Sequence, residues 1–186
     1  MDITKAHRDA LSATRRYVAG TTADQLSAAT PNEGWDVAEL LGHIIYGNRW
    51  VSPLVGGKSI ADVGDALEGD QLGADMVASY DASAAEAAAA FEAPGALAAP
   101  CAVSYGPVPG EVYAGHRFVD VLIHGWDLAV ATGQDATIDP ALVEACFEVI
   151  EPQLDMLEAS GMFGTKVDVD PDADRQTQLL ALLGRS

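Results

Sequence analysis

Cysteine is scarce in this chain of 186 residues, which contains only Cys101 and Cys146. The two thiols lie far apart and lack CxxC spacing, so we expect neither a disulfide framework nor a zinc ribbon. Cys101 fits the role of a small hydrophobic residue better than that of a nucleophile. Because nothing indicates disulfide chemistry, a reducing compartment, the cytoplasm, is the expected location.

Positively charged residues are also few, with 10 Lys and Arg against 28 Asp and Glu, for a formal net charge of -18. A surface of this charge repels the phosphate backbone and anionic lipids. We therefore expect no nucleic acid and no membrane among the partners. An anionic ligand would need local positive charge, supplied by a metal ion or by one of the few arginines.

Long apolar runs and several common motifs are missing too. No stretch of about 18 apolar residues occurs, so no membrane-spanning helix is expected, and the start MDITKAHRDALSATRR lacks the apolar core of a secretion signal. The absence of GxSxG, P-loop, GxGxxG and HExxH motifs removes the usual support for serine hydrolases, nucleotide hydrolases, Rossmann dehydrogenases and zincins. With 49% hydrophobic residues, the chain can form one folded domain over residues 1–186.

Apolar residues recur mainly with helical spacing, and alternating strand patterns are rare. This pattern predicts helices over residues 3–19, 36–51, 74–92 and 111–131, a fifth from 139 to near 161 that Pro152 should kink, and a short helix in DRQTQLLALLG. The second helix should stop at Pro53. We therefore predict an all-α helical bundle. The connections 53–73 and 94–110 are long enough to serve as lids or binding loops.

The start of the second predicted helix carries a strong capping signal. Asp36 is suited to the N-cap and Glu39 to the third helical position, which together form a capping box. Trp35, just before the cap, can pack on Leu40 one turn into the helix.

One helical stripe in the segment 111–131 carries polar residues at positions i, i+4, i+8 and i+11: His116, Asp120, His124 and Asp127. Large apolar residues flank the stripe, so we expect the helix to be buried, where Asp and His are costly unless paired or ligated. Asp120 and His124, one turn apart, suit two ligands of a divalent metal ion. A buried ion pair between them explains the spacing equally well.

His43 of the second helix is a possible third ligand, although a lone histidine on an apolar face is more often a core residue. Two imidazoles and one carboxylate leave open positions at a metal, as in catalytic rather than structural sites. A non-haem iron oxygenase uses the same ligand types, but nothing else supports that reading. Further residues with possible roles near such a site are His7, Glu39, Tyr46, Arg49, Trp50, His116, Trp126 and Asp127.

Five segments carry a family signature: GWDVAELLGHI, FEAPGAL, GPVPG, VLIHGWDLAVATGQ and DRQTQLLALLG. On these segments the chain resembles actinobacterial DinB-like metal-binding proteins and is similar to the N-terminal domain of mycothiol-dependent maleylpyruvate isomerase. The resemblance implies a DinB-like four-helix bundle with a fifth helix and a short C-terminal helical tail. It also implies a divalent metal, commonly zinc, held by His43, Asp120 and His124, with mycothiol as a co-substrate.

The chain departs from that family at two points. The isomerase carries a glutamate where this chain has Asp120, so the carboxylate reaches less far. The isomerase also has an additional C-terminal domain where only a short tail follows the fifth predicted helix. We therefore do not expect maleylpyruvate isomerisation itself.

The leading hypothesis is a thiol-dependent transferase or isomerase, in which a thiolate favoured by the metal attacks an electrophilic substrate. A non-catalytic metal or small-molecule binding protein, or a metal-assisted hydrolase, would use the same ligands and stays open. A homodimer formed through helix faces is compatible with such a bundle. The sequence does not identify the substrate, the native metal or the roles of His7 and His116.

Overall fold

A computed structural model of the protein describes residues 1–154 and 167–185. The chain divides into two compact units, residues 2–135 and residues 136–186 with Met1. The single domain over 1–186 stays a prediction. In the described part of the chain, no helix is long and apolar enough to cross a membrane.

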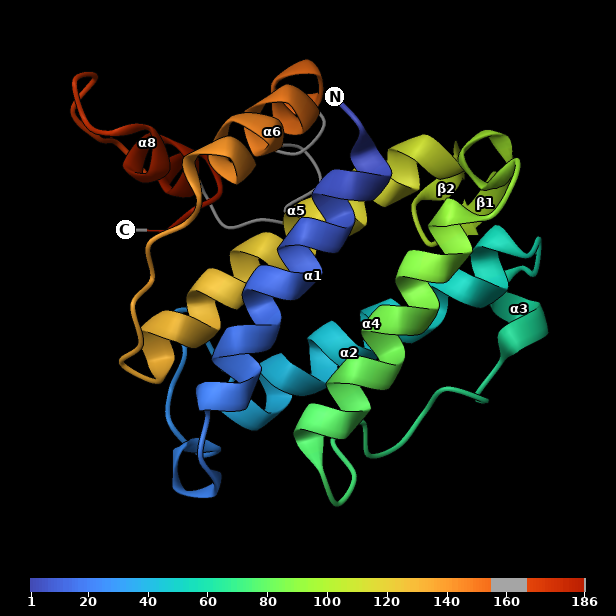
Figure 1. The fold of residues 1–186 in the computed structure, drawn as a ribbon, viewed down its shortest axis with the longest axis horizontal. Helices are drawn as coiled ribbons and strands as arrows, with labels where there is room; N and C mark the ends of the chain where they lie inside the picture. Colours follow the sequence, from blue (N-terminus) through green and yellow to red (C-terminus); the bar gives the residue numbers. More distant parts are fainter. Residues whose placement is uncertain (155–166, 186) are drawn as a thin grey trace. The chain divides into compact units, whose positions relative to one another are not determined.

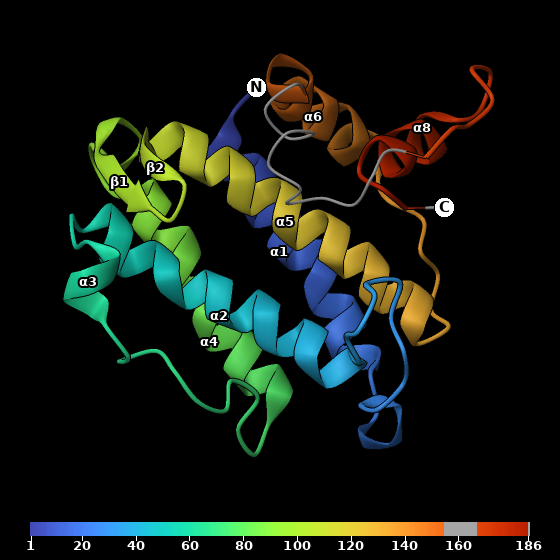
Figure 2. The same ribbon diagram turned by 180° about the vertical axis from the view of Figure 1, so that it is seen from behind.

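The larger unit is a bundle of four long helices, drawn in blue, cyan, green and yellow in Figures 1 and 2. They are α1 (Ile3–Gly20), α2 (Val37–Val55), α4 (Met76–Glu92) and α5 (Gly110–Ala131). Each helix packs on two others, in the closed ring α1–α5–α2–α4. The predicted all-α bundle is therefore confirmed, and α2 lies beside α5 within it.

Local sequence explains where these helices begin. The Asp2 carboxylate accepts a hydrogen bond from the Lys5 N–H, and the predicted capping box of Asp36 and Glu39 is present at the start of α2. The apolar faces then meet in the core, which contains fully buried side chains from all four helices, among them Val18, Leu40, Ile44, Tyr80, Phe91, Phe118 and Ile123. Burial of these faces stabilises the bundle.

The prediction that the second helix stops at Pro53 was wrong, because α2 continues through Pro53 to Val55. Proline lacks an N–H and disfavours the helical conformation of the preceding residue. At this position, however, only the last turn of the helix is affected. The Gly56 N–H donates to the Ser52 carbonyl and the Lys58 N–H to the Pro53 carbonyl, so the chain keeps hydrogen bonds beyond the proline.

The two long predicted connections contain structure of their own. The first holds the short helix α3 (Ile60–Val63) and runs back so that α4 begins at the end of the bundle where α2 begins (Figure 1). The second contains a 3-10 turn (Ala96–Ala98) and the antiparallel strands β1 (Pro100–Val103) and β2 (Gly106–Pro109), paired from Pro100–Pro109 to Val103–Gly106. This hairpin was not predicted from the sequence, because its strands are four residues long and rich in proline, which is depleted in strands.

The smaller unit contains α6 (Pro140–Ile150), a 3-10 turn over Glu151–Gln153 that includes Pro152, and α8 (Arg175–Leu182). The predicted N-cap Asp139 and the following Pro140 begin α6 as expected. The predicted continuation of this helix to Gly161 lies outside the described residues. Arg175 connects the two helices, since it pairs with Glu144 at 2.9 Å and lies over the Phe147 ring.

Candidate metal centre

The helix pair α2 and α5 brings together the three residues that the sequence marked as possible ligands. His43 Nε2 lies 3.2 Å from Asp120 Oδ1, and His124 Nε2 lies 3.6 Å from the same oxygen. One ligand atom from each residue lies within 4.8 Å of the other two. Asp120 and His124 share a face because they are one helical turn apart, whereas His43 arrives through the packing of α2 on α5.

The two separations that include Asp120 Oδ1 suit a bound metal ion. Ligand atoms bound tetrahedrally to zinc at about 2.1 Å stand roughly 3.4 Å apart, and the two distances to Asp120 Oδ1 are 3.2 and 3.6 Å. The side chains of His43, Asp120 and His124 are 35%, 21% and 10% exposed, so the cluster lies at the edge of the core. The His43 side chain is the most accessible of the three to solvent.

The ring orientation of His124 is set by a second carboxylate. Asp127 is fully buried, and its Oδ2 lies 3.0 Å from His124 Nδ1 and accepts a hydrogen bond of 2.9 Å from the Asn32 amide. A carboxylate only accepts hydrogen bonds, so Nδ1 carries the proton. In the neutral ring, the lone pair is then on Nε2, which faces Asp120. Such a nitrogen beside a carboxylate oxygen needs a cation between them, a proton or a metal ion.

Asp120 is held from its other side by Arg117. The Arg117 Nη1 donates to Asp120 Oδ2 at 2.8 Å, which leaves Oδ1 for the two histidines. Burial alone would raise the pKa of the Asp120 carboxyl. The Arg117 charge, with smaller contributions from His124 and His43, outweighs burial and holds that pKa well below its ordinary value. Asp120 is therefore a carboxylate at neutral pH, as a metal ligand must be.

Trp35 forms an aromatic wall beside both histidines. Its ring centroid lies 4.9 Å from that of His43 and 5.8 Å from that of His124. The two imidazole rings meet edge to face at 4.8 Å. The sequence predicted a role for Trp35 only at the start of α2, so its position beside the candidate ligands is a finding of the structure.

Other residues with predicted roles near the site lie elsewhere or have structural partners. Glu39 closes the capping box, and Arg49 donates to Gln71 at 2.6 Å. Tyr46 and Trp50 meet edge to face. Trp126 is buried, as core packing predicts.

Two spare histidines and Cys101 have distinct environments. His116, one turn before Asp120 on α5, has its Nδ1 2.6 Å from the hydroxyl of Tyr105 at the hairpin tip. His7 is fully buried with its ring edge-to-face against Phe91. Cys101 is a buried free thiol whose pKa is raised by burial, as expected of a small hydrophobic residue rather than a nucleophile.

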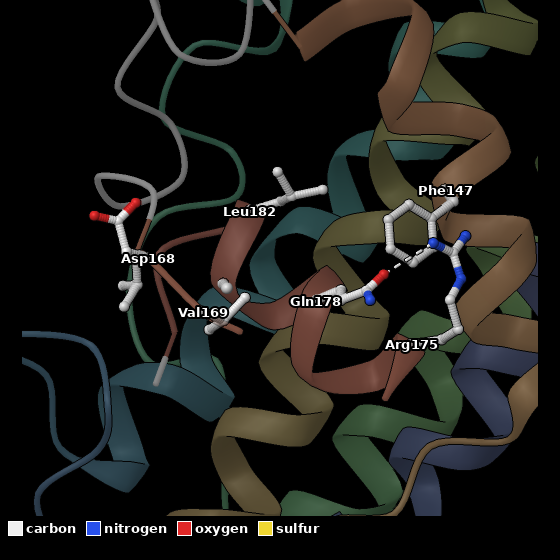
Figure 3. A pocket seen from close by; sticks show the side chains of 8 residues that line it. Phe147, Asp168, Val169, Arg175, Gln178 and Leu182 are labelled. Atoms are coloured by element: carbon white, nitrogen blue, oxygen red, sulfur yellow. Dashed lines mark hydrogen bonds between the residues drawn. The ribbon is translucent and has the colours of Figure 1, made fainter. Parts of the chain in front are cut away.

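A separate hollow of about 380 Å³ lies in the smaller unit (Figure 3). Its polar side chains include Asp168, Arg175 and Gln178, and the Arg175 guanidinium is engaged by Glu144 and Gln178. Among the described residues, no group of His, Cys and acidic side chains that could hold a metal ion lines this hollow, whereas one lies between α2 and α5. The cluster on α2 and α5 is therefore the better candidate for chemistry.

Three residues that contact the candidate ligands or their partners were not predicted at the site from the sequence: Asn32, Trp35 and Arg117. A partial signal existed for Arg117, because an arginine three residues before an acid on a helix can pair with it. Asn32 and Trp35 carry no such local signal. Asn32 contacts Asp127 across 95 positions of sequence, and only the packing of the 21–36 segment on α5 brings them together.

Comparisons with known proteins agree with this fold. Residues 7–129 match the family model described as the mycothiol maleylpyruvate isomerase N-terminal domain. Uncharacterized proteins from two strains of Mycobacterium tuberculosis are 39% identical over 142 residues, which is 76% of this chain and 74% of theirs. Crystal structures of the mycothiol-dependent maleylpyruvate isomerase and of a mutant of it superpose with a TM-score of 0.62. Each superposition covers 82% of this chain and 68% of the isomerase chain. The sequence identity is 17% for the isomerase and 16% for the mutant, so the likeness shows a shared fold.

Proposed function

Because this chain belongs to the mycothiol maleylpyruvate isomerase N-terminal domain family, we propose that it binds a divalent metal ion through His43, Asp120 and His124. We further propose that it acts as a thiol-dependent transferase or isomerase, with zinc as the expected ion and mycothiol as the co-substrate. The observation that carries the proposal is the approach of three ligand-type atoms within 4.8 Å, from two helices.

The donor set supports this proposal over a simple ion pair. An ion pair between Asp120 and His124 requires neither His43 nor a second carboxylate behind His124. Yet His43 Nε2 is closer to Asp120 Oδ1 than His124 Nε2 is, at 3.2 against 3.6 Å. Asp127 holds the His124 ring so that Nε2 points into the cluster. Carboxylate–histidine pairs of this kind orient metal ligands in many proteins.

A divalent cation held there would stabilise the deprotonated form of a thiol. The protein's own residues supply the remaining functions. Asp127 orients His124, Arg117 leaves one Asp120 oxygen free toward the histidines, and Trp35 covers one side of the two rings. The thiol and an electrophilic substrate would approach from the side of His43, whose side chain is 35% exposed.

Element-resolved metal analysis of freshly purified protein tests the proposal. We expect about one equivalent of metal in the wild type, and its loss in both His43→Ala and His124→Ala with the helical circular dichroism retained. His116→Ala is the matched control, because His116 lies on the same stripe of α5 but outside the ligand group, and it should keep its metal. A wild-type protein that carries no metal and takes up none in titration would contradict the proposal.

Calorimetry with a thiol separates an enzyme from an inert scaffold. A thiol-dependent enzyme should bind the thiol only when metal is present. Metal uptake without metal-dependent thiol binding would leave a non-catalytic metal-binding protein as the function of this bundle.

A further inference from the structure

Arg117 is a buried cation in direct contact with the candidate ligand Asp120. It is 7% exposed, and its Nη1 donates to Asp120 Oδ2 at 2.8 Å. Its Nη2 donates to Asn48 Oδ1 at 3.0 Å and reaches the Ile44 carbonyl at 3.5 Å. A buried guanidinium is costly unless it is paired, and the bonds to Asp120 and Asn48 hold this charge beside the candidate metal ligands.

The helix α2 leaves space for this guanidinium. A Cβ atom at Gly47 would stand 2.2 Å from Arg117 Nη1 and 2.6 Å from its Cζ, so only a glycine lets the group lie against the helix. Glycine inside a helix costs about 1 kcal/mol relative to alanine. Gly47 and Asn48 thus form the binding surface of α2 for the guanidinium of Arg117, which belongs to α5.

Arg117, held in this position, changes the net charge of the proposed metal centre. The two histidines are neutral as ligands, Asp120 and Asp127 each carry one negative charge, and Arg117 carries one positive charge. With the divalent ion of the proposed function, the group has one net positive charge. Without Arg117 it would be neutral.

We infer that Arg117 is the specificity-determining residue that makes the metal-loaded centre cationic and thereby selects an anionic ligand, a thiolate, over a neutral one. This inference rests on the proposed metal binding. The whole chain carries a formal net charge of -18, which repels anions from a distance. A fixed positive charge beside the ion, in a partly desolvated site, counteracts that repulsion where the ligand binds.

The test uses the full-length protein loaded with Co²⁺, whose visible absorption reports ligand binding. Azide serves as the anionic probe and imidazole as the neutral probe. In Arg117→Gln, we expect azide affinity to fall about tenfold or more, as loss of a unit charge a few ångströms away implies. Imidazole affinity should stay within about twofold, since a neutral ligand gains little from the charge. Arg117→Lys, the matched control, keeps the charge and should keep most of the azide affinity.

A second variant tests the charge without removing the arginine. Asn48→Asp has nearly the same shape and adds a negative charge at the position 3.0 Å from Nη2, so azide should weaken as in Arg117→Gln. If Arg117→Gln does not fold, this variant decides the question. Azide affinity unchanged in a folded, Co²⁺-loaded variant, or equal losses for azide and imidazole, would overturn the inference. Failure of the wild type to bind Co²⁺ would instead contradict the proposed function itself.

Discussion

His124 meets acidic side chains of its own helix at both ring nitrogens. Nδ1 lies 3.0 Å from Asp127 and Nε2 lies 3.6 Å from Asp120. Asp127 is fully buried, whereas Asp120 is partly exposed. The two carboxylates therefore have different tasks: Asp127 orients the ring, and Asp120 shares the cluster with His43.

Replacing Asp127 by asparagine should weaken metal binding by about tenfold or more, because a neutral amide no longer fixes the proton on Nδ1 or increases the basicity of Nε2. Competition with a chromogenic chelator measures the change. Glu39→Gln is the matched control, since it also converts a carboxylate to an amide but glutamine can replace glutamate in the capping box. Wild-type affinity in Asp127→Asn would contradict the orienting role.

His7 has a different environment, because no hydrogen-bond partner for either ring nitrogen is present among the described residues. Burial, with a smaller contribution from the Arg117 charge, lowers the pKa of His7 from 6.5 to about 3. The folded protein thus holds His7 neutral, while the unfolded chain binds a proton below about pH 6.5. Protonation of His7 therefore favours unfolding. The resulting loss of unfolding free energy is complete only below about pH 3.

We expect the unfolding free energy to decrease as the pH falls from about 6.5 toward 3, with a contribution from His7 on the order of 4 kcal/mol. His7→Phe, which keeps a ring beside Phe91, should remove that part of the pH dependence. Urea unfolding at several pH values measures it. Parallel curves for the wild type and His7→Phe would show that His7 does not titrate on unfolding.

At the scale of elements, α5 contributes the Asp120–His124 pair and has α2 and α1 as neighbours. Its contact with α1 is close: the Thr14 hydroxyl donates to the Val121 carbonyl at 2.9 Å, and a Cβ at Gly125 would stand 2.2 Å from Thr14 Oγ1. Gly125 therefore lets the two helices approach, and it immediately follows His124 in the sequence. The position of the α5 face that carries Asp120 and His124 depends on this contact.

Gly125→Ala should destabilise the protein by about 1–3 kcal/mol, because the strain of overpacking exceeds the gain in helix propensity. Gly42→Ala on α2 is the matched control. Its Cβ would meet Leu72 at an ordinary 3.6 Å, so the change should be neutral or stabilise by up to about 1 kcal/mol. Thermal and urea denaturation measure both. Equal effects of the two substitutions on the unfolding free energy would mean that the close contact between α1 and α5 does not require a glycine at position 125.

At the scale of the whole molecule, the chain divides into two compact units, residues 2–135 and 136–186 with Met1, and the single domain over 1–186 stays a prediction. All three candidate ligands belong to the first unit. A single domain unfolds cooperatively. We therefore expect one calorimetric transition for the full chain, with a van't Hoff enthalpy equal to the calorimetric enthalpy. Two resolved transitions would show that the units are separate domains.

Much of the bundle follows from the sequence, because local rules act within one or two helical turns. The caps at Asp36 and Asp139 and the helical pattern predicted the long helices, although α2 extends beyond Pro53. The hairpin was missed, because four-residue strands with several prolines carry almost no periodic signal.

For the candidate site, the sequence by itself determined that Asp120 and His124 lie one turn apart on one face, since helical geometry requires it. The helical spacing did not place His43 with them. The family resemblance implied that placement, and the tertiary structure shows His43 beside Asp120, 77 residues away. Only the tertiary structure decided that Asn32 reaches Asp127. It also decided that Arg117 of α5, which contacts α2 through Asn48, faces the carboxylate of the candidate ligand Asp120. Contacts between helices depend on how whole apolar faces pack, and no local spacing in the sequence specifies that packing.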